Sequence, residues 1–301
     1  MTKTNGLLLL DKPQGLTSHD VVARVRNITA EKRVGHAGTL DPMATGLLVL
    51  ALGPSTRLLR FAQGEKKRYT GTVHFGIATD SLDADGEVTG EMPVPSFDEE
   101  VLARALAGMR GPQLQTPPMV SALKVGGQRL HQLARQGIEV EREPRAVTIY
   151  EFSLRPSDDP VLWHFDVECS VGTYVRVLLS DLAQRLGTVG HLSALRRVAS
   201  GPHTLDNAIT LDTLAQRVAQ GLAVLAPPLS FVTQLERIQL SDDQERRARM
   251  GQRIELASPF TMDEIVAIDA RGVLIGILRS RGDLWKPELI FPVEPGSAQL
   301  G

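Results

Sequence analysis

The strongest candidate for catalysis in this sequence is an aspartate within a glycine-rich segment. Residues 35–46 contain three glycines, His36 and a single carboxylate, Asp41, which precedes a proline. Glycines let a backbone adopt positive φ and approach a ligand closely. The apolar residues 47–52 follow and predict a buried strand that anchors the segment. Asp41 is therefore a candidate for chemistry, or alternatively only the cap of a turn, since Asp-Pro is a common turn starter.

Several other kinds of site lack their usual patterns. There is no Gly-x-Gly-x-x-Gly motif opening a helix, no phosphate-binding Gly-Lys-Ser/Thr and no nucleophile-elbow serine. The histidines lack metal-ligand spacing, and the lone Cys169 excludes an intrachain disulfide and a multi-cysteine metal site. A hydrolase with paired carboxylates stays open at this point, because Asp41 and Asp80 could converge in the fold.

Length and composition indicate an ordinary soluble protein. The chain has 301 residues, of which 42% are hydrophobic and 23% charged, and its length suggests about two domains. The N-terminus does not resemble a signal peptide, and no apolar run reaches the roughly 18 residues of a membrane helix. We therefore expect a cytoplasmic protein without membrane association.

Charge is unevenly distributed along the chain, although the formal net charge is only −2. Residues 1–70 hold eleven Lys or Arg against five Asp or Glu, whereas residues 80–100 hold eight acids and no Lys or Arg. Local basic surface governs phosphate contact, so the near-neutral total does not exclude an RNA partner. A solvated basic face is the simpler interpretation of the surplus alone.

The first half of the chain alternates short strands and helices. Residues 6–10 read as a strand, and Thr17 with Asp20 forms a capping box that starts a helix. From Tyr69 the apolar pattern has period two, which predicts a half-buried strand. The acidic segment 79–86 lacks the full pattern of a calcium loop, and we expect a solvated turn there. Ser96 with Glu99 predicts a second capping box.

The second half continues with helices and alternating strands. Residues 113–145 look like an excursion from the main sheet, with a short helix at 130–136. Strands are predicted at 146–154 and 161–169. Without regular βαβ alternation, the first 235 residues indicate the α+β class. Two further helices and the C-terminal strands are expected at 174–186, 211–219, 265–269 and 273–280. A boundary near residue 235 divides a catalytic domain, 1–235, from a small β-rich unit, 236–301.

Taken together in order, the motifs resemble those of the TruB family of pseudouridine synthases. The matching segments are Leu10-Asp11-Lys12-Pro13, residues 35–42, Lys67-Arg68-Tyr69, residues 79–86, Gln115 to Lys124, Cys169 to Arg176, and Leu195-Arg196-Arg197. The chain departs from the family at His131, where tyrosine is more common. The resemblance implies a mixed, largely antiparallel sheet with helices, followed by a PUA-type RNA-binding domain at 236–301.

The resemblance also implies an activity, the isomerisation of the T-loop uridine at position 55 of tRNA to pseudouridine. The base is flipped out, and its glycosidic bond is broken and re-formed through C5. Because reactant and product are isomers, we expect no cofactor and no metal. The implied partner is the T-arm of tRNA, and we expect a monomer without an obligatory protein partner.

By resemblance, Asp41 is the essential carboxylate, Arg176 its ion-pair partner and Tyr69 the aromatic that stacks on the flipped base. We expect Arg176 to outweigh burial, and so to lower the pKa of Asp41. Further matches are expected to contact the substrate, with Tyr174 and Leu195 in the pocket and His36 in the space that the flipped nucleotide leaves. Phosphate contacts are expected from Lys12, Lys124 and Arg129. The residues available to extend that basic surface are Lys66, Lys67, Arg68, Arg142 and Arg145.

These residues also have structural interpretations, and the whole protein has alternative functions. Tyr69 can be a core aromatic, Tyr174 a core residue at a helix start, and Arg176 a surface arginine. A non-catalytic RNA-binding or tRNA-folding protein of the same fold would need none of this set. A guide-dependent relative acting on ribosomal RNA is a further alternative within the enzyme class.

Overall fold

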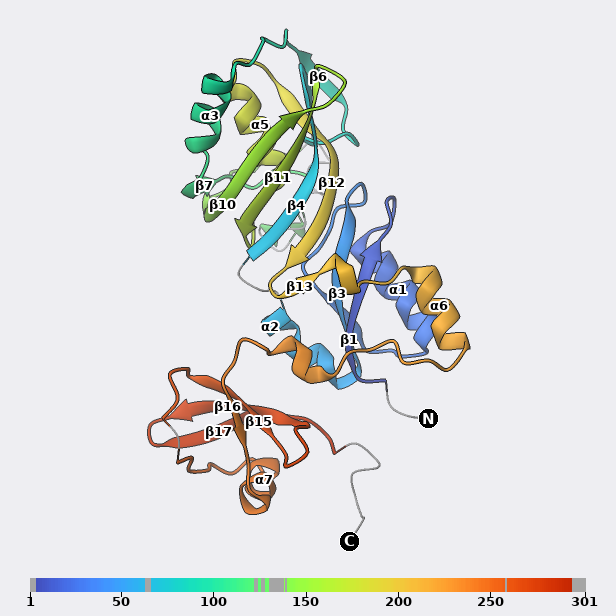
Figure 1. The fold of residues 1–301 in the computed structure, drawn as a ribbon, viewed down its shortest axis with the longest axis vertical. Helices are drawn as coiled ribbons and strands as arrows, with labels where there is room; N and C mark the ends of the chain where they lie inside the picture. Colours follow the sequence, from blue (N-terminus) through green and yellow to red (C-terminus); the bar gives the residue numbers. More distant parts are fainter. Residues whose placement is uncertain are drawn as a thin grey trace.

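A large mixed sheet forms the centre of the computed structural model, which describes residues 4–62, 66–121, 124–125, 128–129, 138, 140–257 and 259–293. Within these residues nine strands form one sheet in the order β1-β3-β12-β4-β11-β10-β7, with β2 paired to β3 and β13 to β12 (Figure 1). The strands are β1 (Gly6–Lys12), β2 (Val34–Ala37), β3 (Thr45–Leu52), β4 (Lys66–Phe75), β7 (Gly111–Gln115), β10 (Arg145–Pro156), β11 (Leu162–Ser170), β12 (Gly190–Ser200) and β13 (His203–Thr204).

The sheet is mostly antiparallel, which confirms the predicted α+β class. Among its described pairings, only β12 and β3 run parallel, through Arg196↔Thr45 and Arg197↔Gly46. This contact joins the strand that leaves the Asp41 loop to a strand from the far end of the domain. The sheet thereby positions residues that are distant in sequence around one loop.

Helices cover the sheet in two groups (Figure 1). Buried side chains of one group pack beside β1 and β3, and those of the other beside β10 and β11. The first group is α1 (Ser18–Thr29) and α6 (Leu211–Ala219), and the second is α3 (Glu99–Ala107) and α5 (Val175–Arg185). The remaining short elements are η1 (Gly53–Leu58), α2 (Leu59–Ala62), β5 (Ile77–Thr79), β6 (Val88–Glu91), β8 (Lys124–Val125), β9 (Gln128–Arg129), η2 (Leu205–Asn207) and η3 (Pro228–Phe231).

The predicted capping box of helix α1 is correct, whereas the one predicted for helix α3 is wrong. Thr17 and Asp20 form the predicted capping box of α1, with Asp20 N–H donating to the Thr17 hydroxyl at 3.1 Å. The box predicted at Ser96 is wrong, because α3 begins later. Its cap is Asp98, whose Oδ1 accepts from Val101 N at 2.7 Å. The true cap therefore lies two positions after the serine that matched the pattern.

Two predicted stretches differ in the structure, and a third lies outside the described residues. His36 belongs to strand β2 rather than to a loop, so the loop around Asp41 is shorter than expected. Residues 113–115 belong to β7 at the edge of the main sheet, so the excursion begins after Gln115. The predicted helix 130–136, which includes His131, lies outside the described residues.

The C-terminal residues form a second, smaller sheet. In the described part of the chain its order is β14-β15-β16-β17, and the predicted strands at 265–269 and 273–280 are confirmed as β15 and β16. One helix was not predicted, because a single residue of it, Ala248, is buried and its sequence carries no apolar stripe. The elements are β14 (Arg237–Gln239), α7 (Asp242–Arg249), β15 (Glu264–Ile268), β16 (Leu274–Arg281) and β17 (Leu284–Ile290).

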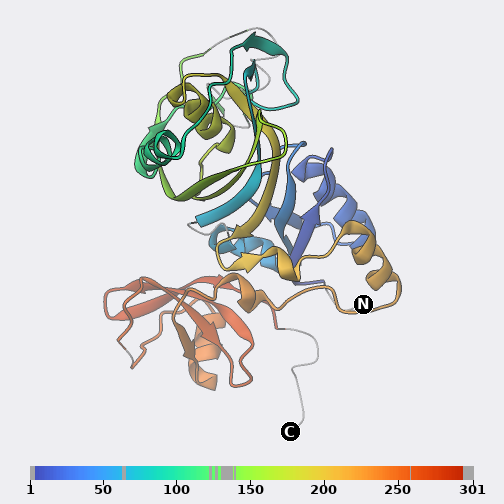
Figure 2. The ribbon, with the colours of Figure 1, turned by 45° about the horizontal axis from the view of Figure 1, so that its top comes forward.

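The small sheet packs against α2 and η1 of the larger unit (Figure 2). Its Val266 and Ile277 share one apolar cluster with Leu58 and Ala62. At the rim, Arg60 forms an ion pair with Glu264 at 2.8 Å. The domain boundary near residue 235 stays a prediction. None of the helices in the described ranges is long and apolar enough to span a membrane.

Candidate active site

The loop that carries Asp41 connects β2 to β3 and is fixed from the side of α1. Ser18 Oγ accepts from the backbone N–H of Leu40 at 2.9 Å and donates to its carbonyl at 3.2 Å. Gly15 N–H donates to the carbonyl of Pro42 at 2.8 Å. Asp41 therefore lies between two residues whose backbones are held by hydrogen bonds.

The same loop is fixed from the side of β12 by Arg197, which is fully buried. Its guanidinium donates to the carbonyls of Leu47 at 2.7 Å and Gly38 at 3.1 Å. Gly38 has φ +91°, and a Cβ there would lie 2.7 Å from Lys67 Nζ. A Cβ on Gly46, at φ +98°, would lie 2.4 Å from the Arg197 carbonyl. The glycines thus allow close packing within the protein.

Lys12 has a different position from the one expected. The residue is completely buried, and its ammonium donates to the carbonyls of Leu16 at 2.6 Å and Pro42 at 3.3 Å. Burial lowers the pKa of Lys12 to about 8. The expectation that Lys12 contacts RNA phosphates is wrong for this structure, because its charge is used to hold the Asp41 loop.

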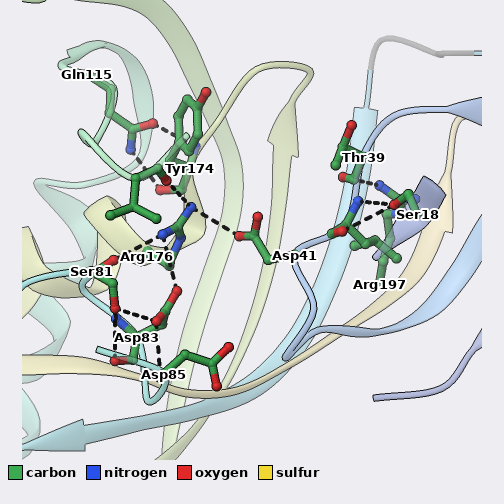
Figure 3. A network of polar contacts seen from close by, with 12 residues as sticks. Ser18, Thr39, Asp41, Ser81, Asp83, Asp85, Gln115, Tyr174, Arg176 and Arg197 are labelled. Carbon is green, nitrogen blue, oxygen red and sulfur yellow. Dashed lines mark hydrogen bonds and ion pairs between the residues drawn. The ribbon is translucent and has the colours of Figure 1, made fainter. Parts of the chain in front are cut away.

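Arg176 connects two carboxylates from distant parts of the chain (Figure 3). Its Nη2 lies 3.1 Å from Asp41 Oδ2, and its Nη1 lies 3.1 Å from Asp83 Oδ2. The same two nitrogens donate to the carbonyls of Val120 and Ser81 at 3.0 Å. The Arg176 side chain is only 4% exposed, which rules out a surface arginine. The Asp41 side chain, at 40% exposed, is open to the solvent.

The acidic turn between β5 and β6 is partly buried, contrary to the expectation of a solvated turn. Asp83 is 4% exposed, and its carboxylate accepts from the Ser81 hydroxyl and from Asp85 N–H at 3.2 Å. Asp80 instead is exposed and accepts from Glu87 N–H at 2.9 Å. The carboxylate that approaches Asp41 through a shared arginine is therefore Asp83. The geometry does not pair Asp41 with Asp80.

The pKa of Asp41 is raised above its ordinary value, which corrects the expectation that Arg176 lowers it. Desolvation by the protein around this partly exposed carboxylate is the largest cause, and the Arg176 guanidinium opposes it without outweighing it. One physical reason is that Arg176 is shared with Asp83, whose negative charge also raises the pKa of Asp41. The site therefore holds a carboxylate that is ionised only at a higher pH than usual.

Asp41 opens into a cavity of 320 Å³. Five of the residues predicted to be catalytic or to lie in the pocket line it: Asp41, Tyr69, Tyr174, Arg176 and Leu195. The other lining residues are Thr39, Leu40, Lys67, Ser121, Gly172, Thr173 and Val175. The cavity thus gathers side chains from the Asp41 loop, β4, β12 and the start of α5.

The two tyrosines of the cavity are held differently. Tyr69 lies on β4 between β11 and β12 and is 7% exposed, and burial raises its pKa against the opposing charge of Arg197. It is therefore both a core residue and a cavity residue. Tyr174 precedes α5, and its backbone is clamped by Gln115: the N–H donates to Oε1 at 2.7 Å and the carbonyl accepts from Nε2 at 3.1 Å.

Two known protein families match long segments of this chain. The N-terminal domain of TruB family pseudouridylate synthases matches residues 26–175, and the C-terminal domain of tRNA pseudouridylate synthase B matches residues 176–224. The relative from Streptococcus pneumoniae serotype 4, named tRNA pseudouridine synthase B, is 41% identical over 95% of this chain and 99% of its own length.

The chain belongs to the TruB family of pseudouridine synthases. Its relative from Opitutus terrae, also named tRNA pseudouridine synthase B, is 50% identical over 70% of this chain and 87% of its own. The crystal structure of a Cbf5-Nop10-Gar1 complex matches 95% of this chain and 85% of that chain, with a TM-score of 0.72 and 23% identity. At this identity the structure supports the fold alone.

His36, expected to bind substrate in a TruB-family enzyme, lies outside the cavity lining. His36 makes an edge-on contact with His19, their ring centroids 5.6 Å apart, and burial lowers its pKa. The lowered pKa favours the neutral imidazole, and the role of His36 toward the substrate stays a prediction. Lys124 and Arg129 pair through their backbones in the β8–β9 hairpin. Their side chains lie outside what the structure describes.

Sequence patterns did not predict the roles of four residues at this site. Asp83, Gln115 and Arg197 lie within the TruB-like motifs, but a motif does not show which of its polar residues are buried. Lys67 was assigned to an exposed basic surface, because lysine is seldom buried. For Lys67 the available signal was its position two residues before Tyr69, which places both on one face of a strand.

Proposed function

We propose that this enzyme converts the T-loop uridine at position 55 of tRNA to pseudouridine, with Asp41 as its catalytic carboxylate. The observation that carries the proposal is Asp41 itself, half-exposed in a 320 Å³ cavity and paired with Arg176 at 3.1 Å. The relatives named tRNA pseudouridine synthase B support tRNA as the substrate.

The cavity suits a base that has left its stack. Its volume lies within the range of small-molecule sites, roughly 300–1,000 Å³. Extruding a stacked base costs a few kcal/mol, and stacking it on an aromatic side chain returns about 1–3 kcal/mol. In the proposed complex the uracil stacks on Tyr69, and Leu195 packs against it from β12.

Asp41 acts in its ionised form. The reaction breaks the N1–C1′ bond, turns the uracil and rejoins it to the ribose through C5. Asp41 serves as nucleophile at C1′, as nucleophile at the base, or as base on a glycal route. Arg176 keeps the carboxylate oriented and partly offsets the burial that disfavours its charge. The isomerisation is proposed to need no cofactor.

RNA contacts are proposed to extend beyond the cavity. His36 enters the space that the flipped nucleotide leaves, and the excursion containing Lys124 and Arg129 grips the T-arm. Residues 236–301 act as a PUA-type RNA-binding domain, and the enzyme works as a monomer in the cytoplasm.

The test is release of tritium from T-arm RNA labelled at C5 of uridine. Asp41→Asn should lower the release rate by at least about 10⁴-fold, as expected for a group that acts directly in the chemistry. Its tRNA affinity should stay within several-fold of wild type. Asp212→Asn, at an exposed aspartate in the first turn of α6, is the matched control and should keep full activity. Turnover retained in Asp41→Asn would refute the role of Asp41, and no release by the wild-type enzyme would refute the proposed reaction.

A further inference from the structure

Lys67 is a buried lysine in the wall of the cavity. The residue is 8% exposed and lines the cavity together with Asp41 and Tyr69. It lies on β4 two residues before Tyr69, so both side chains leave the same face of the strand, about 7 Å apart along it. Its ammonium lies against the Asp41 loop, where a Cβ on Gly38 would be 2.7 Å away.

The other cations around the Asp41 loop have partners within the protein. Arg176 has two carboxylates, and Lys12 and Arg197 each donate to backbone carbonyls. Among the described residues, Lys67 forms no hydrogen bond and no ion pair. The fixed charge of Arg197 lies close enough to disfavour the ammonium, and with burial it lowers the pKa of Lys67 to about 8.

The neighbours of Lys67 on β4 show the contrast. Lys66 pairs with Glu168 at 2.8 Å, and Arg68 pairs with Asp166 at 2.9 Å, both on the adjacent strand β11. These two point to the other face of the sheet and are satisfied there. A buried charge without a partner is costly, so a retained one indicates that its partner arrives from outside. Lys67 lines the cavity, and a partner that enters the cavity can reach it.

We propose that Lys67 is a catalytic residue whose ammonium stabilises the negative charge that develops on the uracil oxygens when the glycosidic bond breaks. This role rests on the proposed function of the cavity as the site of the flipped uridine. If the uracil stacks on Tyr69, the Lys67 ammonium lies at the edge of the ring, where O2 or O4 is presented.

The reaction places negative charge where such a group can stabilise it. When the N1–C1′ bond breaks, its electron pair passes to the uracil and spreads over O2 and O4. If Asp41 instead adds to the ring first, the ring again becomes an enolate. C5 then bonds to C1′, the proton on C5 leaves, and N1 gains a proton, so that the product is an isomer of the reactant. Lys67 keeps its own proton throughout.

A backbone phosphate is the competing anionic partner. The position of Lys67 favours the base, because Lys67 lines the same cavity as Asp41 and Tyr69, and its ammonium lies against Gly38 in the segment that leads to Asp41. Phosphates of a bound nucleotide stay nearer the solvent than its base does when the base enters the cavity. A preorganised cation in a water-poor site is also most effective where charge appears during the reaction.

The test compares Lys67→Met with Lys32→Met, which removes an exposed ammonium at a lysine outside the proposed RNA contacts. Single-turnover tritium release at saturating tRNA, tRNA affinity as a function of salt, and thermal unfolding are measured for both. Lys67→Met should slow release by about 10²- to 10³-fold, the usual loss for one transition-state donor. Its affinity should stay within about threefold, and its unfolding temperature should be equal to or above that of wild type, because an unpaired buried charge is removed. Lys32→Met should release tritium at the wild-type rate.

Three outcomes would overturn the proposal while leaving the proposed function intact. A Lys67→Met rate within about threefold of wild type would remove any catalytic role. Weaker binding with a shallower salt dependence and an unchanged saturating rate would make Lys67 a phosphate contact. A lower unfolding temperature with restored activity in stabilising conditions would make it structural. The wild-type enzyme releasing no tritium would instead refute the proposed function.

Discussion

Two buried arginines flank Asp41, and they do different work. Arg176 is bonded to two carboxylates, whereas Arg197 is bonded to neutral backbone carbonyls (Figure 3). Carbonyls keep the same charge at every pH, so the hydrogen bonds by which Arg197 fixes the shape of the loop do not depend on pH. Carboxylates titrate, so Arg176 couples the position of Asp41 to its charge. The comparison separates a residue that sets geometry from one that also sets reactivity.

The largest effect is expected for Arg176→Met. The change leaves Asp83 buried without its partner, and breaking a buried ion pair costs about 3–5 kcal/mol of unfolding free energy. Activity should fall by at least about 10³-fold, because Asp41 also loses its cation. The stability loss should shrink as pH falls from 7 towards 4, since protonation neutralises an unpaired carboxylate. Denaturant unfolding across this pH range measures it, and a loss that does not change with pH would contradict the assignment.

A smaller effect is expected for Arg197→Met. The carbonyls of Gly38 and Leu47 lose their donor inside the protein, which should cost about 2–4 kcal/mol. Here the stability loss should be the same at pH 4 and pH 7, because carbonyls do not titrate. The same unfolding series provides the measurement. A loss that varies with pH as strongly as in Arg176→Met would erase the distinction between the two arginines.

The smallest of these effects on rate is expected for Asp83→Asn, but it should be the most informative about pH. The change removes a negative charge that raises the pKa of Asp41 and leaves Arg176 to Asp41 alone. Since Asp41 acts ionised, the acidic limb of kcat/KM should move to lower pH. The rate at pH 7 should fall about tenfold through looser positioning of Arg176. A limb that stays in place would show that Asp83 does not influence the titration of Asp41.

The raised pKa of Asp41 also affects the stability of the fold. In the window between its ordinary value and the raised value, the folded protein binds more protons at Asp41 than the unfolded chain does. Stability from this group is therefore present at low pH and is lost as pH rises through the raised pKa. The ionised, active form of Asp41 is thus less favourable for folding than the protonated form.

Local patterns were sufficient to predict many elements. The capping box at Thr17 gave the start of α1, and the period-two pattern from Tyr69 gave β4. The strand β3 after Asp41 followed from its unbroken apolar run. These signals lie within a few residues of the elements that they specify, so the chain alone carries them.

The polar interior of the site was not predictable from local patterns. Asp83 lies in a turn whose acidic composition is the same whether it is solvated or buried, and only contact with Arg176, far along the chain, decides between them. Lys12 and Lys67 look like surface residues, because burial of lysine depends on tertiary contacts. The pairing of Asp41 with Arg176 was expected through family resemblance, whereas their shared electrostatics required the three-dimensional arrangement.

The parallel pairing of β12 with β3 has a consequence for how the site comes into existence. Thr45 bonds to the carbonyl of Leu195, and Arg197 to that of Leu47, across 150 residues of chain in each case. Contacts of such high sequence separation form late and slowly in folding. During synthesis the Asp41 loop leaves the ribosome long before the strand that shapes it, so a nascent chain ending before β12 holds the reactive carboxylate in an unfinished site. The order of translation thereby delays catalytic competence until nearly the whole large sheet has been made.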